Sequence, residues 1–187
     1  MTPARPGDPL TWPVAGLLRE SPGASRVYPV AGVTIDVGED LELADPIEGT
    51  VRLTRTNRGL LVHARLTTAL AGQCSRCLRD IEVPLELAID EEALPSIDLE
   101  TGAPVDTTAE PDVLRLTAQH ELDLEPTVRE SIQLAEPIAP LCREDCPGLC
   151  EVCGEDLADH PHEHEAEIDP RLEALRAFTV DGDVRTH

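Results

Sequence analysis

The chain has 187 residues, which suits one domain with tails or one domain with a small metal-binding module. Its 37 acidic and 15 basic residues, every base an arginine, give a formal net charge of −22 at pH 7. A polyanion of this kind repels nucleic acid at long range and is better suited to a basic partner.

No apolar run approaches the length that is needed to cross a bilayer, and the N-terminal stretch lacks the charged-then-apolar order of a secretory signal. We therefore expect a cytoplasmic protein without a membrane partner. Thiols stay reduced in the cytoplasm, so the six cysteines favour metal binding over disulfide bonds.

The first part of the chain, residues 1–30, is marked by prolines rather than by periodic apolar residues. Only the run from Val14 to Leu18 has the apolar content of a short element. This composition predicts a flexible proline-rich arm, with at most one short helix that docks on the following domain.

A β-rich domain is predicted over residues 31–140. Its first clear strand is Ile47 to Thr56, which ends at Asn57-Arg58-Gly59. Asn and Gly tolerate the positive φ that tight hairpin turns demand, so this tripeptide predicts a turn.

The two best alternating patterns follow this turn. Apolar residues fall on one face from Leu60 to Leu70 and again from Ile81 to Ile89. A period of two predicts strands with one buried face, here paired as an antiparallel hairpin. The motif C-S-R-C, which contains Cys74 and Cys77, lies at the tip of that hairpin.

The region after the hairpin is expected to contain a loop, a short strand and a helix. Residues 91–112 are rich in acids, prolines and threonines and predict an exposed acidic loop, and a short strand follows at Val113 to Ala118. A helix is predicted over about 124–136, because Pro126 is tolerated in a first turn and an apolar stripe continues from it. The stripe consists of Leu124, Val128, Ile132 and Ala135. A second short helix is predicted at residues 169–176, which begin with Asp169-Pro170.

Together these elements predict an α+β fold. An antiparallel β-sheet made of hairpins carries one packed helix, and residues 141–178 form a C-terminal zinc-knuckle module with a short helix. The flexible arm and the acidic insertion loop are attached to this core.

Positive charge is concentrated in one stretch of the chain. Between Thr50 and Arg79 there are six arginines and no acid. These are Arg52, Arg55, Arg58, Arg65, Arg76 and Arg79. Two interpretations stay open: the arginines pair with acids on the neighbouring strand, or they contact RNA or another phosphate-bearing partner.

The cysteines and two of the histidines lie at spacings typical of metal ligands. Cysteines separated by two or three residues place thiolates where they can converge on one tetrahedral ion, and zinc is the ion we expect. The candidate ligands are Cys74, Cys77, Cys142, Cys146, Cys150, Cys153, His162 and His164.

Two arrangements of these ligands stay open. In one, the four cysteines between Leu141 and Leu157 form a single local site and the hairpin pair is free. In the other, the hairpin pair completes site 1 and the histidines complete site 2. Site 1 then contains Cys74, Cys77, Cys142 and Cys146, and site 2 contains Cys150, Cys153, His162 and His164. A hairpin tip presents two thiolates from one side and needs a second pair, which favours two sites. All of these sites are closed by four protein ligands, so they predict structural metal and no catalytic residue.

Three motifs carry a resemblance to a known family. They are C-S-R-C-L from Cys74, P-I-A-P-L-C-R-E-D-C-P-G-L-C-E-V-C-G-E-D-L from Pro137, and D-P-R-L-E-A-L from Asp169. Together they resemble the bacterial YceD family, formerly classed as a domain of unknown function, over about residues 30–178. The resemblance implies a role in accumulation of the large-subunit ribosomal RNA. It also implies a gene that often lies beside that of a small zinc-ribbon protein of the large ribosomal subunit.

The resemblance also bears on the ligands. Members of the family usually have C-x-C where this chain has His162 and His164, which implies that these histidines keep a metal-binding role. Some members lack the later knuckle but keep the hairpin pair, and they have histidines in place of Cys142 and Cys146. The resemblance thus supports grouping the hairpin pair with these two cysteines.

Two functions from different classes follow from the sequence. The first is a non-enzymatic ribosome assembly factor whose partner is a ribosomal protein, a pre-ribosomal particle or rRNA, with no small-molecule substrate. The second is a redox-sensitive zinc-thiolate chaperone or thiol sensor. A metal-dependent nuclease or hydrolase is not expected, because the sequence has no Walker motif, nucleophile elbow or H-E-x-x-H pattern.

Overall fold

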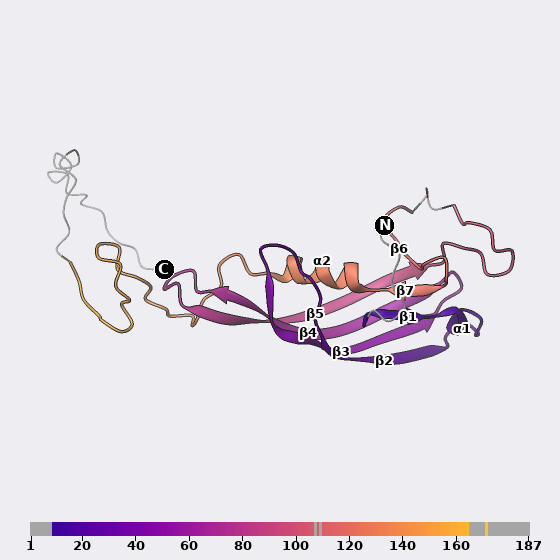
Figure 1. Cartoon of the computed structure of the whole chain (residues 1–187), viewed down its shortest axis with the longest axis horizontal. Helices are drawn as coiled ribbons and strands as arrows, with labels where there is room; N and C mark the ends of the chain where they lie inside the picture. Colours follow the sequence, from indigo (N-terminus) through magenta and orange to yellow (C-terminus); the bar gives the residue numbers. More distant parts are fainter. Residues whose placement is uncertain (1–8, 107, 109, 165–170, 172–187) are drawn as a thin grey trace, which may run out of the picture.

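The computed structural model describes residues 9–106, 108, 110–164 and 171. The molecule is elongated: a long twisted sheet runs along its axis, α2 lies against β5, and the cysteine-rich segment extends beyond one end of the sheet (Figure 1). The elements are β1 (Thr11–Pro13), α1 (Ala15–Leu18), β2 (Ser25–Val33), β3 (Glu42–Arg55), β4 (Leu60–Gln73), β5 (Asp80–Leu94), β6 (Leu114–Arg115), β7 (Glu121–Asp123) and α2 (Glu125–Ala135).

The main sheet has five strands in the order β2-β3-β4-β5-β6. Its first three pairings are antiparallel and the last, between β5 and β6, is parallel. The β4–β5 hairpin is the longest pairing, with Leu60 opposite Ala93 at one end and Gln73 opposite Asp80 at the other. The predicted antiparallel sheet is confirmed, and the C-S-R-C motif follows Gln73 at the hairpin tip.

The core lies on one face of this sheet. In β4, every second side chain from Leu60 to Leu66 is buried, and the residues between them are exposed. The buried faces of β3 and β5 continue the same layer, because opposite residues of paired strands point to the same side. Aliphatic side chains fill it, as expected for a chain with so few aromatic residues.

Helix α2 closes the core over β5. Pro126 lies in its first turn, where a missing N–H costs no helical hydrogen bond. Val128 and Ile132 are fully buried against the sheet. The predicted helix is confirmed, but Ala135, the last residue of the predicted stripe, is exposed because the helix ends there and the chain turns away.

The N-terminal stretch is the main difference from the sequence prediction. Leu10, Val14 and Leu17 are fully buried, β1 pairs with β7, and β2 forms the edge of the main sheet. The predicted flexible arm over residues 1–30 is therefore wrong from Leu10 onward. The prolines are compatible with this packing: Pro29, for example, lies in an edge strand, where one side of the backbone needs no partner. The short helix predicted within Val14 to Leu18 is α1.

The acidic loop is shorter than predicted. Strand β5 continues through Glu91 and Glu92 to Leu94, so the loop begins at Pro95 and ends before β6. The short strand predicted at Val113 to Ala118 is β6. The helix predicted at residues 169–176 lies outside the described residues, apart from Arg171. How the chain divides into folding units stays a prediction.

Among the described residues, no helix has the length and apolar character of a membrane span.

Candidate metal centres

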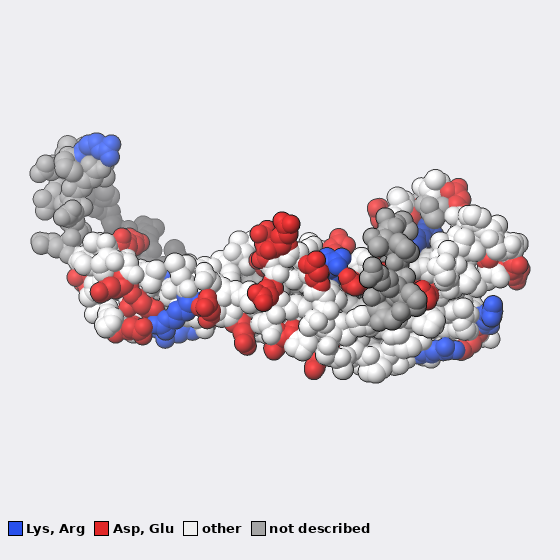
Figure 2. Space-filling view, viewed as in Figure 1, with Lys and Arg blue, Asp and Glu red and all other residues white. Residues whose placement is uncertain are grey.

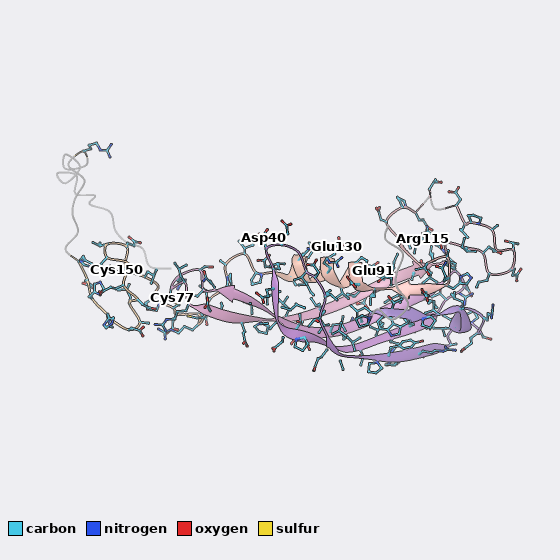
Figure 3. The ribbon with its side chains drawn as sticks, in the orientation of Figure 1. Asp40, Cys77, Glu91, Arg115, Glu130 and Cys150 are labelled. Carbon is cyan, nitrogen blue, oxygen red and sulfur yellow. The ribbon has the colours of Figure 1, made fainter. Side chains whose placement is uncertain are left out.

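Four cysteines from two distant parts of the chain meet at the end of the sheet. Cys74 and Cys77 lie at the tip of the β4–β5 hairpin, and Cys142 and Cys146 lie in the segment that follows α2. The four sulfur atoms all lie within 4.8 Å of one another. The structure thus brings together the residues that were grouped as site 1; Figure 3 labels Cys77 at this end of the sheet.

The hairpin tip is folded so that both thiols face the same way. The Cys74 N–H donates to the Arg79 carbonyl at 2.9 Å, and the Leu78 N–H donates to the Cys74 carbonyl at 2.9 Å. Leu78 has a φ of 58°, in the left-handed region that a branched apolar residue rarely adopts. This tight turn brings the Cys74 and Cys77 side chains to one side of the tip.

The segment after α2 is fixed to this tip by its backbone. The Ser75 N–H donates to the Pro140 carbonyl at 2.8 Å, and the Arg76 guanidinium donates to the Cys146 carbonyl at 2.9 Å. Ile81, Leu141 and Leu149 pack around the buried cysteines and form a small second core. Site 1 therefore joins the hairpin to a segment that lies about seventy residues later in the sequence.

The donor set and spacing of site 1 fit a tetrahedral zinc ion. Four thiolates about 2.3 Å from one ion at tetrahedral angles have sulfur atoms about 3.8 Å apart. The Cys74 and Cys146 sulfurs are 3.8 Å apart, and those of Cys77 and Cys142 are 3.7 Å apart. All six cysteines are free thiols, so these contacts are not disulfides.

The thiols of site 1 differ in acidity. The backbone N–H of Cys142, followed by that of Cys77, donates to the Cys74 sulfur, and these bonds lower the pKa of Cys74 to about 6. The hydrogen bond with Cys146 raises the pKa of Cys142 to about 12. Backbone amides therefore favour the thiolate form of Cys74, whereas its neighbours favour the thiol form of Cys142.

A second group of ligands lies in the next stretch of the chain, the residues assigned to site 2. The ligand atoms of Cys150, Cys153, His162 and His164 lie within 4.8 Å of one another. The chain beneath them forms a tight turn: the Gly154 N–H donates to the Cys150 carbonyl at 2.8 Å, and Gly154 has a φ of 75°. Glycine fits here because it adopts a positive φ without steric cost. The predicted zinc knuckle stays a prediction.

The tautomer of His162 suits a ligand. Its Nδ1 lies 2.7 Å from the His160 carbonyl, so Nδ1 carries the proton and donates to that oxygen. Nε2 then keeps the lone pair with which it can bind a metal ion. Nε2 lies 3.1 Å from the Cys153 sulfur, whereas the two would lie about 3.6 Å apart on a tetrahedral zinc ion. The donor set fits zinc if this pair opens by a few tenths of an ångström.

Hydrogen bonds with backbone groups also shift the pKa values of two site 2 ligands. The backbone N–H groups of Cys153 and Val152 lower the pKa of Cys150 to about 6. The His160 carbonyl, followed by Cys150, raises the pKa of His162. A neutral imidazole and two thiolates are the metal-binding forms of these groups.

Arg79 connects the two sites. Its guanidinium lies 2.7 Å from Asp156 and 2.6 Å from Asp159, both in the site 2 segment. The sequence leaves open whether Arg79 pairs with acids of the neighbouring strand or contacts a partner, and it singles out neither Asp156 nor Asp159. The only available signal was the excess of acids after Gly154, which does not identify a partner.

Gly148 is the second residue that sequence reasoning missed. It has a φ of 81°, and a Cβ atom there would lie 3.1 Å from the Arg76 carbonyl oxygen. The adjacent Leu149 N–H donates to that same oxygen at 3.1 Å. Gly148 thus lets the backbone between the two sites lie directly against the hairpin tip.

Most of the six arginines are held by groups of the protein itself. Arg65 pairs with Asp90 on the neighbouring strand at 3.2 Å, as the cross-strand interpretation predicts. Arg55 donates to the carbonyls of Leu18 and Gly59. Arg58 pairs with Glu110, while Arg76 and Arg79 hold the metal-ligand segment. Arg52 has no ion pair among the described residues, and contact of these arginines with RNA or a partner stays a prediction.

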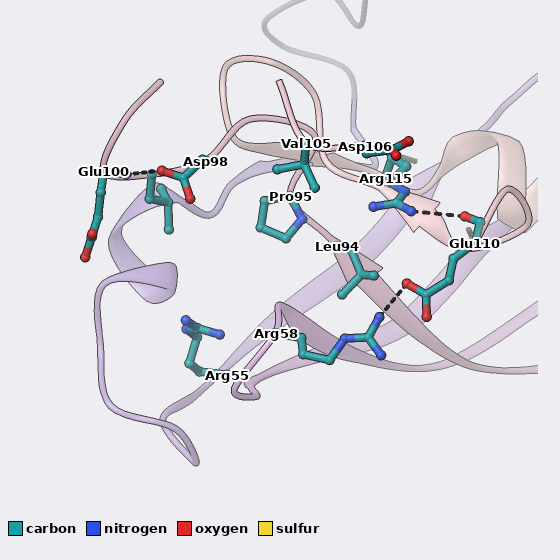
Figure 4. Close-up of a pocket in the computed structure, with 11 residues that line it drawn as sticks. Arg55, Arg58, Leu94, Pro95, Asp98, Glu100, Val105, Asp106, Glu110 and Arg115 are labelled. Carbon is teal, nitrogen blue, oxygen red and sulfur yellow. Dashed lines mark hydrogen bonds and ion pairs between the residues drawn. The ribbon is translucent and has the colours of Figure 1, made fainter. Parts of the chain in front are cut away.

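A pocket of about 430 Å³ lies at the opposite end of the sheet. Its lining includes Arg55 at the end of β3, Arg58 in the β3–β4 turn and Arg115 in β6, together with Leu94 (Figure 4). Glu110 pairs with Arg58 through its carboxylate and accepts from Arg115 through its carbonyl. Much of the charge in this pocket is therefore satisfied within the protein.

Comparison with known proteins identifies a matching family and several similar proteins. A family model described as large ribosomal RNA subunit accumulation protein YceD matches residues 62–179. Uncharacterized proteins of Mycobacterium tuberculosis and Mycobacterium bovis are each 33% identical over 144 residues, which is 76% of this chain and 64% of the relative. An uncharacterized protein of Mycobacterium leprae is 28% identical over 133 residues, or 70% of this chain and 58% of the relative. No solved structure matches the chain.

This chain thus covers less than two thirds of the length of these mycobacterial relatives. The family match begins in β4 and extends over more than half of the chain. It includes the hairpin, α2 and all eight candidate ligands, so the resemblance seen in the motifs is confirmed. The chain belongs to the YceD family, the large ribosomal RNA subunit accumulation proteins.

Proposed function

We propose that this protein is a non-enzymatic zinc-binding factor that supports accumulation of the large-subunit ribosomal RNA by holding a basic ribosomal protein. The observation that carries the proposal is the pair of four-ligand clusters at one end of an acidic molecule. The family description names rRNA accumulation and no reaction, which supports a role in assembly.

Zinc is the metal that suits both donor sets. Thiolate and imidazole ligands in tetrahedral arrangement are typical of structural zinc, which has no geometric preference of its own. Each cluster supplies four protein ligands, so neither leaves a coordination position for a water or a substrate. We therefore assign the ions to architecture: site 1 joins hairpin and tail segment, and site 2 shapes the knuckle.

Charge favours a protein partner over RNA. Acidic side chains outnumber arginines across the face shown in Figure 2. Five of the six arginines between Thr50 and Arg79 already bind groups of the protein, which leaves few free cations for phosphate. A basic ribosomal protein complements such a surface and would be steered to it at low ionic strength.

A tagged, zinc-loaded full-length chain tests the proposal in lysate of its own host, with and without ribonuclease. We expect recovery of large-subunit proteins or pre-ribosomal particles, with at least one basic protein retained after ribonuclease treatment. Recovery that disappears with ribonuclease would assign the contact to rRNA and contradict a protein partner. Recovery of neither would contradict the assembly role.

A thiol sensor is the second candidate, and one observation favours it. Cys142 and Cys153 are exposed, so an oxidant can reach one ligand of each cluster. Treatment with mild peroxide separates the two functions. Retention of zinc and of six reduced thiols excludes the sensor, whereas rapid zinc release with gain of chaperone activity supports it.

A further inference from the structure

Two aliphatic side chains stand fully in solvent at the end of α2. Leu134, in its last turn, is 80% exposed, and Ile138, just beyond the helix, is 104% exposed relative to the reference state. Single exposed leucines are common and need no explanation. Two large aliphatic residues spaced by four, both with almost no contact to the rest of the protein, form a more specific feature.

The helix geometry places Leu134 away from the core. Val128 and Ile132 face the sheet and are fully buried, so the opposite side of the helix contains Glu130 and Leu134. Residues four apart on a helix are neighbours on one face. Leu134 therefore stabilises no packing within the described residues, and Ile138 follows it in the sequence just beyond the end of the helix.

Acidic side chains surround this pair. The loop before β3 lies against the last turns of α2, since the Gln133 amide donates to the Val37 carbonyl at 2.9 Å. Glu39 and Asp40 follow at once, and Figure 3 shows Asp40 and Glu130 on the same side of the molecule. We define the α2 patch as Leu134 and Ile138 with the exposed acids Glu39, Asp40, Glu130 and Glu136.

The negative charge of the α2 patch is not neutralised within the described part of the chain. None of its four carboxylates takes part in an ion pair there. The nearest base along the helix, Arg129, is occupied by Glu125 at 2.6 Å and by the Asp36 carbonyl at 2.6 Å. The patch thus combines two apolar anchors with a rim of unpaired acids.

We propose that the α2 patch is a docking site for an arginine- or lysine-rich protein segment that presents aliphatic side chains to Leu134 and Ile138. Apolar anchors surrounded by a polar rim are the usual energetic centre of an interface, and the acids select a basic partner. RNA and anionic membrane surfaces are disfavoured, because four unpaired carboxylates repel phosphate. The inference rests on the proposed function and names the surface through which it acts.

Two double variants test the apolar side chains and the acidic side chains of the α2 patch independently. The double variant Leu134→Ser/Ile138→Ser removes the apolar contact, and Glu130→Gln/Glu136→Gln removes half of the charge. Matched controls lie on the open face of the main sheet, where Val27 is 52% and Leu61 is 40% exposed: Val27→Ser/Leu61→Ser and Glu82→Gln/Glu86→Gln. Because the patch side chains are exposed, the patch variants should keep the zinc content and Tm of the wild type.

The measurement is the affinity of each full-length variant for individually purified large-subunit ribosomal proteins, by fluorescence anisotropy at two salt concentrations. For the protein that wild type binds, we expect the apolar variant to weaken binding about tenfold or more. The charge variant should slow association and reduce the salt dependence, while both controls stay within about twofold of wild type.

The possible outcomes distinguish failure of the docking site from failure of the proposed function. If wild type binds a basic ribosomal protein and the apolar variant binds it equally well, the α2 patch is not the docking site and the proposed function stands. If wild type binds none of the large-subunit proteins, the proposed function fails and the docking site fails with it. Binding by wild type to an rRNA fragment alone contradicts both.

Discussion

The sulfur atoms of Cys74 and Cys146 lie 3.8 Å apart although 72 residues separate them in the sequence. Between them the chain completes β5, a long acidic loop, β6, β7 and α2. A metal ion bound at this point would close a large loop of the fold and fix the hairpin tip to the segment that carries site 2. The predictions below follow from this closure.

Substitution of one metal ligand should remove the zinc ion of one site and leave the ion of the other site bound. Cys74→Ser leaves three ligands at site 1, and a structural zinc contributes on the order of 10 kcal/mol to the fold that it closes. We expect loss of one zinc and rapid hydrogen exchange at the Ser75 and Leu149 amides, which join the two segments.

The matched variant is Cys150→Ser, which should also lose one zinc but keep the Ser75 amide protected. Retention of zinc by Cys74→Ser together with its loss in Cys150→Ser would indicate the single local site among Cys142, Cys146, Cys150 and Cys153. It would contradict the closure of hairpin and tail by site 1.

A Cβ atom at Gly148 should weaken metal binding. Gly148→Ala places a side chain at a φ of 81°, 3.1 Å from the Arg76 oxygen. A left-handed alanine costs about 1–2 kcal/mol, so we expect zinc affinity to fall by roughly tenfold in a chelator competition. Gly102→Ala has a φ of 69° with nothing within 4 Å, and it should leave zinc affinity unchanged. Equal effects of the two variants would argue against the close approach.

Acid should release the two ions at different pH values. Zinc binds neutral imidazole, and the raised pKa of His162 lets protons compete with the ion at a higher pH than for an ordinary histidine. Thiols have a higher ordinary pKa than imidazole, about 8.5 against about 6.5, and site 1 has four of them, so we expect site 1 to release zinc first as the pH falls and site 2 second. A zinc-responsive dye measures both steps, and His162→Cys should move the site 2 step to higher pH. Release of both ions in one step in both proteins would be inconsistent with this assignment.

The cross-strand pair on the open face predicts a pH effect. Arg65, followed by a weaker contribution from His63, lowers the pKa of Asp90 in the folded protein. The stabilisation is therefore present above the unfolded pKa of about 3.9 and is lost as the pH falls through the lower folded value. NMR titration of the Asp90 carboxyl should show Arg65→Gln moving its pKa back toward the ordinary range. Arg52→Gln, which removes no ion pair with Asp90, serves as the control and should have little effect.

The sequence predicts best what depends on local periodicity. The alternation from Leu60 to Leu70 and from Ile81 to Ile89 predicts the hairpin, because each strand has one buried face. The same pattern places Cys74 and Cys77 at the tip. The clustering of these cysteines with Cys142 and Cys146 required a further argument, namely that a hairpin pair needs two more ligands from elsewhere.

Long-range packing was harder to predict. The prolines of residues 1–30 suggested a flexible arm, yet Leu10, Val14 and Leu17 fill the core because β7 and β3 supply partners that lie far away in the sequence. Arg79 shows the same limit: its two acids, Asp156 and Asp159, follow it by almost eighty residues. No local pattern specifies contacts of that kind.

The most direct test is the mass of the intact, undenatured protein, purified without added chelator and compared with the same protein after acid denaturation. The account predicts two bound zinc ions per chain in wild type and one in either Cys74→Ser or Cys150→Ser. A single zinc that both variants lose would contradict the two-site arrangement, and a metal-free protein with an intact fold would contradict the structural role of zinc altogether.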